Sequence, residues 1–282
     1  MISKQTSERI AFAVVTAATV IVVTPVILIV AYILINGLPG ISWEFVSQMP
    51  THGMKAGGIF PAIYGTILLI IGTALFAVPL GVGAAIYLAE YAEEGRLTRA
   101  IRLAIINLAG VPSVVYGLFG LGLFVVFLGM GSSVLAGSLT LAILVLPVII
   151  ASAEEAIRAV PQDFRQASLA LGATKWQTVR NQVLPNALPG ITTGIVLGLG
   201  RAAGETAPIL FTAAAFFLPR LPTSPFDQVM ALPYHLFVIA TQIPGMPVEK
   251  QYGTALILLL IVLSAYGVAT IVRMRFAARK LW

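Results

Sequence analysis

Arg201 and Glu205 carry opposite charges four residues apart in the stretch GLGRAAGETAPIL, which lies within a long apolar run. Residues at this spacing share one face of a helix, so the two side chains can form an ion pair. A charge within a membrane is costly unless it faces a partner charge, the protein interior or water. The pair is therefore either a structural ion pair that fixes a helix or part of a site for an ion.

A guanidinium group is planar, permanently charged and rich in donors, which suits the oxygen atoms of phosphate or another oxyanion. In this interpretation Arg201 attracts the anion, while Glu205 positions Arg201 and prevents it from holding the anion too tightly. A carboxylate also accepts the proton of hydrogen phosphate, which sulfate lacks at neutral pH. Glu205 would then contribute to selectivity.

The composition places these charges in a membrane protein. Of the 282 residues, 59% are hydrophobic and only 10% are charged, and the mean hydropathy is +0.97. Apolar runs longer than about 18 residues mark candidate spanning helices. We therefore predict an all-α integral membrane protein, a single membrane domain over 1–282, with six transmembrane helices at 10–35, 61–89, 103–128, 134–153, 188–213 and 254–272.

The distribution of Lys and Arg predicts the orientation. Thirteen of the 17 lie at the amino end, in 90–102, in 154–187 and in the carboxyl tail, against three in the opposite loops. Excess positive charge marks the cytoplasmic side, so both termini of this multi-pass protein are expected there.

The first run is too long for a signal peptide and reads as a retained helix. Starting from Leu188, Arg201 lies roughly 20 Å into a core about 30 Å thick, in its outer half.

Four glycines precede Arg201, and a fifth lies between Arg201 and Glu205. Small residues at a spacing of four let another helix approach closely. This spacing predicts packing along a pore or a permease interface, with simple packing between helices as the alternative. The glycines form two adjacent strips, Gly190, Gly194 and Gly198 on one and Gly200 and Gly204 on the other.

The predicted cytoplasmic segment 154–187 is too long for a simple connection and carries helix start and stop signals. Pro161 suits the first position of a helix, and Gly172 suits the residue after its end. Thr174 and Gln177 have the spacing of a capping box. We predict two short helices meeting at a sharp turn, either as an amphipathic hairpin on the bilayer surface or as a docking surface for a partner.

This segment resembles the EAA loop of binding-protein-dependent ABC importer permeases. The family pattern is Glu-Ala-Ala, three residues, Gly, nine residues, an aliphatic residue, one residue and Leu-Pro. The spacing matches throughout, but Gln166, Ser168 and Gln182 depart from the pattern. The matching stretch contains the residues that the resemblance assigns to ATPase coupling: Gln166, Ala167, Ser168, Gly172, Thr174, Leu184 and Pro185.

The resemblance extends over about residues 56–280. The stretches GVPSVVYGLFG, GRAAGETAP and ALPYHLF are similar to those of the PstA family of phosphate permeases. The resemblance implies type I ABC importer architecture in a bacterial or archaeal plasma membrane. It also implies a second, PstC-like permease, two PstB-like ATPase subunits docked on 161–185 and an extracytoplasmic PstS-like phosphate-binding protein. A permease for sulfate or molybdate is the nearest alternative.

The sequence lacks the machinery to hydrolyse ATP. It contains no GxxxxGK[ST] phosphate-binding loop and no recognisable set of nucleophile and base. We expect a transport subunit rather than an enzyme, with no cofactor of its own and with ATP and Mg²⁺ on the partner ATPase. His52 and His235 lack convergent ligands, so no metal site is expected. A stand-alone anion channel or secondary transporter is the competing class.

Overall fold

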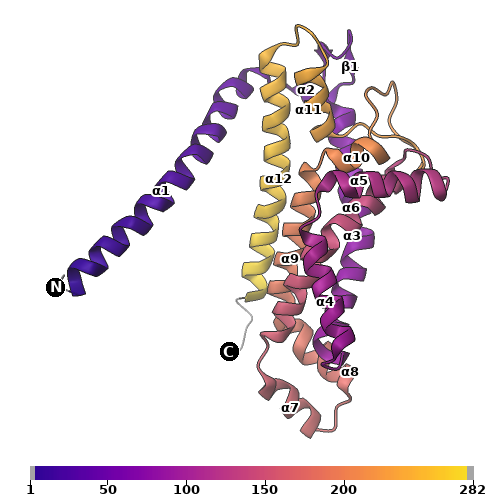
Figure 1. Cartoon of the computed structure of the whole chain (residues 1–282). Helices are drawn as coiled ribbons and strands as arrows, with labels where there is room; N and C mark the ends of the chain where they lie inside the picture. Colours follow the sequence, from indigo (N-terminus) through magenta and orange to yellow (C-terminus); the bar gives the residue numbers. More distant parts are fainter. Residues whose placement is uncertain (1–3, 278–282) are drawn as a thin grey trace.

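The computed structural model describes residues 4–277, and almost all of its regular elements are helices (Figure 1). Two cationic residues of the tail, Arg279 and Lys280, lie outside the described residues. In chain order the elements are α1 (Lys4–Gly37), η1 (Leu38–Gly40), α2 (Trp43–Ser47), β1 (Pro50–Thr51), β2 (Ala56–Gly57), α3 (Phe60–Ile86), η2 (Tyr87–Tyr91), α4 (Arg96–Ala109), α5 (Ser113–Gly120), η3 (Leu121–Phe127), α6 (Val134–Arg158), α7 (Gln162–Ala170), α8 (Lys175–Thr178), η4 (Val179–Val183), α9 (Leu184–Gly204), α10 (Ala207–Thr212), α11 (Leu232–Thr241) and α12 (Val248–Ala277).

Five described helices are long and apolar enough to cross a membrane, or six if one bent pair counts as a single span. The bent pair corrects the prediction of a continuous helix over 103–128. Its two parts meet at 103°, so that α5 lies across the bundle in Figure 1. The bend falls at Gly110, Val111 and Pro112, because a proline lacks a backbone donor and disfavours helical geometry in the residue before it. The hydroxyl of Tyr116 donates to the Leu108 carbonyl oxygen across the bend, at 2.8 Å.

The segment 154–187 also differs from its prediction, because its second helix is not short. The predicted capping box of Thr174 and Gln177 is confirmed, and it begins a helix that continues to Gly204. The π-helical turn η4 ends two residues before Pro185, and such local adjustments let a helix pass a proline. We call α7, α8, η4 and the turn around Gly172 the elbow (162–183).

The predicted helix over 188–213 is broken near its far end. α9 ends at Gly204, and Glu205 has an extended backbone, with ψ of 129°. The chain then re-enters the helical conformation as α10, which starts with Pro208 near its first position. The break occurs beside the charged pair, so it decides where Glu205 points.

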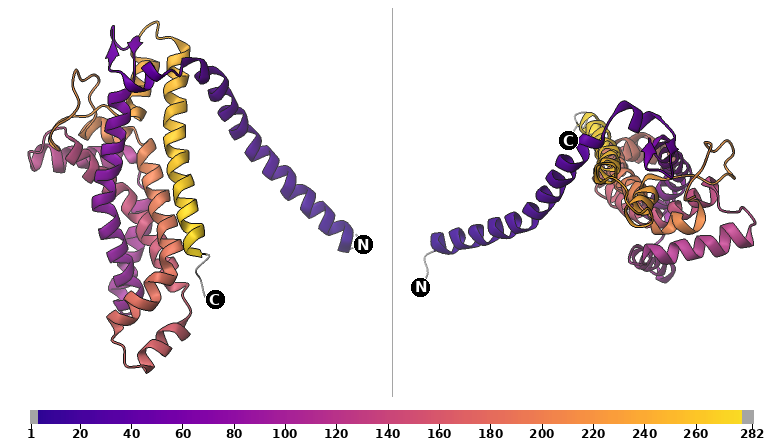
Figure 2. Two further views of the ribbon diagram at one scale, coloured as in Figure 1. Left: turned by 180° about the vertical axis from the view of Figure 1, so that it is seen from behind. Right: turned by 90° about the horizontal axis from the view of Figure 1, so that it is seen from above.

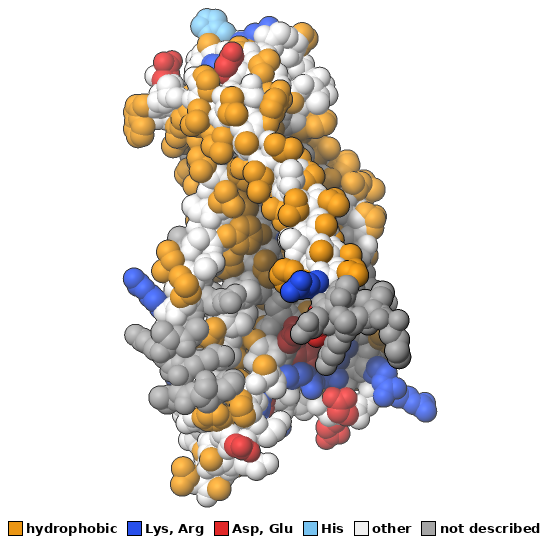
Figure 3. All heavy atoms as spheres, turned by 90° about the vertical axis from the view of Figure 1, so that its left-hand side faces the viewer, with side chains coloured by type: hydrophobic (Ala, Val, Ile, Leu, Met, Phe, Trp, Pro, Cys, Tyr) orange, Lys and Arg blue, Asp and Glu red, His pale blue; other side chains and the backbone are white. Residues whose placement is uncertain are grey.

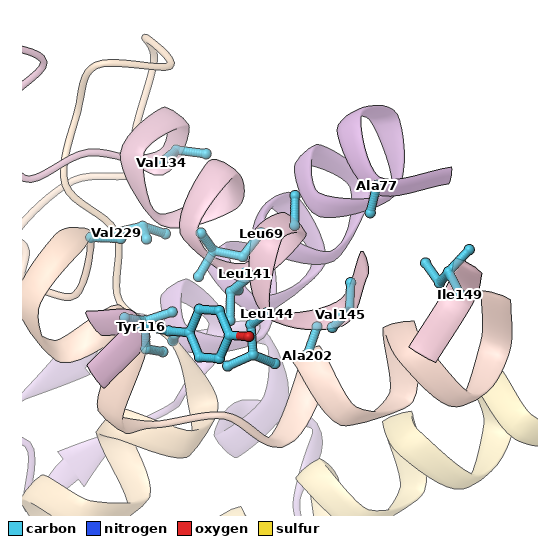
Figure 4. Packing of buried hydrophobic residues seen from close by; sticks show 14 residues of the cluster. Leu69, Ala77, Tyr116, Val134, Leu141, Leu144, Val145, Ile149, Ala202 and Val229 are labelled. Carbon is cyan, nitrogen blue, oxygen red and sulfur yellow. The ribbon is translucent and has the colours of Figure 1, made fainter. Parts of the chain in front are cut away.

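Three helices, α3, α6 and α9, form the centre of the bundle, and small residues bring them together. A Cβ atom added to Gly190 or Gly194 would overlap the Cβ of Ala156 or Ser152 on α6. Gly72 on α3 approaches α6 in the same way. A buried apolar cluster that includes Leu69, Tyr116, Leu141 and Ala202 lies between these helices and α5 (Figure 4).

The amino-terminal helix α1 stands apart from this bundle. It diverges from α12 and meets the rest of the chain only near its carboxyl end (Figure 2). There Tyr32 makes an edge-to-face contact with Tyr252, with ring centroids 5.4 Å apart. None of the apolar stretch within α1 is buried inside the chain. Its apolar surface is left for lipid or for another protein.

We expect Gly194→Ala to destabilise the protein by about 1–3 kcal/mol, because the added Cβ would overlap Ser152. Gly83→Ala is the matched control: Gly83 also lies within a helix, but a Cβ there would meet nothing within 4 Å. The control should gain up to about 1 kcal/mol from helix propensity. Thermal unfolding midpoints of the detergent-solubilised variants test this, and equal shifts in the two would contradict close packing of α6 and α9.

Candidate functional site

Arg201 and Glu205 do form an ion pair in the structure. Nε of Arg201 donates to Oε1 of Glu205 at 3.2 Å. Arg201 lies in the last turn of α9, where a positive charge is favourable, and Glu205 is the first residue beyond that helix. The Arg201 side chain is 38% exposed and that of Glu205 is 15% exposed. The guanidinium therefore faces the surface of the isolated chain, while the carboxylate faces inward.

The buried side of the pair borders a small cavity of about 10 Å³. This is room for about one water molecule and too little for an oxyanion. Among the residues that line this cavity, Glu205 is charged and Thr66 from α3 is polar. The rest of the lining is apolar and comes from α3, α6, α9, α10 and the segment leading into α11: Leu69, Ile70, Leu141, Ala202, Ala203, Ile209, Ala231 and Pro233.

Tyr116 was not singled out from the sequence, although it belongs to the surroundings of the pair. It is 5% exposed and lies within electrostatic reach of Arg201. Tyr116 belongs to the same buried cluster as Ala202, which is one residue from Arg201 (Figure 4). A tyrosine in an apolar stretch gives no signal by itself, and only the bend before α5 brings it to α9. The adjacent Gly117 lets α5 approach the backbone of α10 at Pro208.

The five glycines of α9 divide differently from their prediction. Gly190, Gly194 and Gly198 face α6 of the same chain, and Gly200 faces the ring of Tyr266 on α12. Gly204 has no atom within 4 Å of a built Cβ, so its predicted packing role has no counterpart within the described chain. The first four glycines therefore hold α9 between α6 and α12.

Five of the seven EAA-like residues lie in the elbow, and Leu184 and Pro185 follow directly after it as the first residues of α9. Gly172 has a φ of +84°, the left-handed conformation that suits glycine at the end of a helix. Ser168, where the family pattern has alanine, places its hydroxyl 2.9 Å from that of Thr178. This contact links the two arms of the elbow, which are α7 and the helix that begins with α8 and η4. Gln166 and Ala167 are exposed, Leu184 is half-buried and Pro185 is exposed.

Large apolar side chains are also exposed on the elbow. Leu171 is 90% exposed and Trp176 is 51% exposed. The charged side chains visible in Figure 3 gather mainly toward this end of the molecule, below a broad apolar belt. An apolar surface rimmed by charge, at the end of a bundle, has the character of a protein-binding site.

Neither histidine joins a metal site. The described residues contain no group of three or more His, Cys, Asp or Glu side chains that could hold an ion. His52 lies in the turn between β1 and β2, with a φ of 49°. His235 is buried in α11, a short helix in the loop before α12, and burial lowers its pKa to about 4. It is therefore neutral at physiological pH.

The model of the family described as "Binding-protein-dependent transport system inner membrane component" matches residues 77–278. The "Probable ABC transporter permease protein YqgI" of Bacillus subtilis is 37% identical over 243 residues, covering 81% of this chain and 82% of that protein. "Phosphate transport system permease protein PstA 1" of Mycobacterium tuberculosis is 37% identical over 231 residues, covering 79% and 75%.

A solved structure supports the fold. The bacterial ABC transporter involved in import of the polysaccharide alginate contains a chain that aligns with a TM-score of 0.64 at 15% identity, covering 95% of this chain and 96% of that one. The chain belongs to the family of binding-protein-dependent transport system inner membrane components. It is a multi-pass inner-membrane transport subunit with the type I ABC importer permease fold, and ATP hydrolysis belongs to a separate subunit.

Proposed function

We propose that this chain is the permease subunit of an ATP-driven importer of inorganic phosphate, and that Arg201 and Glu205 lie on the path of the anion. The observation that carries the site assignment is an arginine, 38% exposed, near the end of a long apolar helix. The substrate is supported by the similarity to relatives named as phosphate transport permeases. Family membership favours an importer over a stand-alone channel or secondary transporter.

The ion pair leaves most of the guanidinium available. Among the described residues, Arg201 donates only from Nε to Glu205, so its two terminal amino groups have no acceptor in the protein. These groups can bind two phosphate oxygens side by side. Glu205 lowers the net positive charge of the site, so the anion is attracted without being trapped. Its second carboxylate oxygen can accept the proton of hydrogen phosphate.

The elbow supplies the movement. Its second arm continues without a break from Lys175 to Gly204, so Arg201 lies about 39 Å along the same helix. An ATPase subunit that binds the elbow can therefore act directly on the helix that carries the anion site. ATP and Mg²⁺ bind that ATPase, and the chain needs no cofactor of its own.

The same arrangement supports the proposed partners. α1 presents an apolar surface that its own chain does not cover, and this supports pairing with a second, PstC-like permease. Two PstB-like ATPase subunits dock at the elbows on the cytoplasmic side, where both termini lie. A PstS-like protein delivers phosphate to the opposite end, which carries the β1–β2 hairpin and α11 (Figure 1).

We expect Arg201→Ala to reduce phosphate uptake by roughly 10- to 100-fold below saturation, because charged hydrogen bonds of about 1.5–3 kcal/mol are lost. Uptake is measured in cells lacking other phosphate importers, with membrane level and ATPase docking checked. Arg220→Ala, which removes an exposed loop arginine, is the matched control and should transport normally. Recovery of uptake in Arg201→Ala combined with Glu205→Ala would instead identify a structural ion pair.

Glu205→Gln tests selectivity separately from charge attraction. The amide keeps an oxygen for the bond from Arg201 but exchanges the second carboxylate oxygen for a donor. We expect the preference for phosphate over sulfate to fall by about tenfold, as one hydrogen bond to the substrate is lost. Competition between labelled phosphate and excess sulfate measures it, and an unchanged ratio would remove Glu205 from the selectivity mechanism.

The elbow can be tested through its turn. Gly172→Ala places a side chain at a φ of +84°, which costs about 1–2 kcal/mol. Gly129→Ala is the control, because its φ is +65° and its surroundings are equally open, but it lies in the turn before α6. We expect several-fold less ATPase to co-purify with the Gly172 variant alone. Equal loss in both variants would indicate general destabilisation instead.

A further inference from the structure

The π-helical turn η2, which ends the long helix α3, contacts both arms of the elbow. Oε1 of Glu90 accepts bonds from Arg165 on α7, at 2.7 Å from Nη2 and 3.1 Å from Nε. The next residue, Tyr91, has the Nζ atom of Lys175 over its ring, 4.9 Å from the centroid. Lys175 is the first residue of α8. Two adjacent residues of η2 therefore hold the two arms.

The Glu90–Arg165 pair is more protected than the other ion pairs at this end of the protein. Its side chains are 8% and 11% exposed, whereas Glu94 in the nearby pair with Arg102 is 76% exposed. Buried charges that lose their partner are strongly disfavoured, while exposed pairs contribute little. The protected pair resists separation when the elbow is moved.

Arg165 is also bound to a third helix. Its guanidinium donates to the carbonyl oxygen of Ile157 in the last turn of α6, at 2.9 Å, and to that of Val160 just beyond the helix, at 2.6 Å. Arg165 directly precedes Gln166, and Gln166 is the residue that stands where the family pattern has glutamate. A cavity of about 490 Å³ lies between the elbow and η2 and is bordered by Glu90, Arg165, Gln166 and Lys175. The contacts bridge this hollow rather than form part of a continuous packed core.

Two of the helices that line the Glu205 cavity, α9 and α3, lead to the elbow. α9 supplies Ala202 and Ala203, and it is covalently continuous with the second arm. α3 supplies Thr66, Leu69 and Ile70, and η2 continues it to the elbow, as one helical span from Phe60 to Tyr91. A moving elbow would act directly on α9, to which it is covalently joined, whereas without a link at η2 it would reach α3 only indirectly, through the packing of α6.

We propose that Glu90 and Tyr91 form a clamp that transmits movement of the elbow to α3, so that α3 and α9 move together around the anion site. This inference rests on the proposed function. It assigns Glu90, Tyr91, Arg165 and Lys175 as positioning residues for the transport step, with no contact to the anion. The clamp joins the helices through side chains and persists through the transport cycle.

The first test is Glu90→Gln in the complete importer reconstituted in liposomes. The amide keeps the shape of the side chain and one acceptor but removes the charge, and it leaves the bonds from Arg165 to α6 available. We expect the phosphate moved per ATP hydrolysed to fall at least about threefold, with normal amounts of bound ATPase. Glu94→Gln, a neutralised exposed glutamate at the same end, should keep the wild-type ratio.

Uptake and hydrolysis falling in parallel, together with lost ATPase, would show that the pair only supports the elbow and would overturn the clamp. An unchanged ratio in Glu90→Gln would overturn it as well. If the wild-type complex transports no phosphate at all, the proposed substrate fails instead. The clamp is then tested by the distance between spin labels on Glu93→Cys and Leu169→Cys, two exposed positions that leave the four clamp residues in place. This distance should stay constant when ATP binds, and a change would refute the clamp.

A second variant distinguishes loss of the clamp from misfolding, because its link can be restored. The chain has no cysteine, so Tyr91→Cys with Lys175→Cys provides two unique thiols. This double variant lacks the cation–π contact, and joining the thiols with a bifunctional reagent restores the link covalently. We expect cross-linking to raise the phosphate moved per ATP toward the wild-type ratio. A cross-link that abolishes transport would show that the contact must open during the cycle, contrary to the proposal.

Discussion

The structure depends on one constraint: a charge or backbone polar group within an apolar layer must have a partner. Arg201 meets it through Glu205, and the break at the end of α9 allows the carboxylate to turn inward while the guanidinium stays accessible. Two charges that neutralise each other are tolerated far better than one. The same pair can then attract an anion, because the terminal amino groups of Arg201 have no acceptor within the described chain.

Because the helices near this pair are closely packed, a force on the elbow would move whole helices rather than single side chains. Gly190, Gly194 and Gly198 press α9 against α6, and such contacts transmit displacement because packed interiors deform little. α9 reaches the elbow as a continuous helix, whereas α3 reaches it through Glu90 and Tyr91. Both helices line the cavity beside Glu205, together with α6, α10 and the segment leading into α11, so the shape of the cavity depends on where these helices lie.

Two apolar surfaces of the isolated chain are left uncovered. α1 diverges from the bundle with its apolar surface uncovered, and the elbow exposes Leu171 and Trp176. One surface suits a membrane or a second permease, and the other lies among charged groups at the end of the bundle. Both agree with a subunit of an importer that draws its energy from another protein.

The sequence by itself determined the membrane class, the number of spans to within the bent pair, the capping box at Thr174 and the charged pair, because apolar length, capping residues and i,i+4 spacing are local properties. Only the tertiary structure decided the 103° bend before α5, the continuity of the elbow with α9, and the burial of Glu90 with Arg165. These features depend on contacts between residues far apart in the chain. Local patterns do not encode which helices meet, so they could not show that Tyr116 approaches α9 or that α3 holds the elbow.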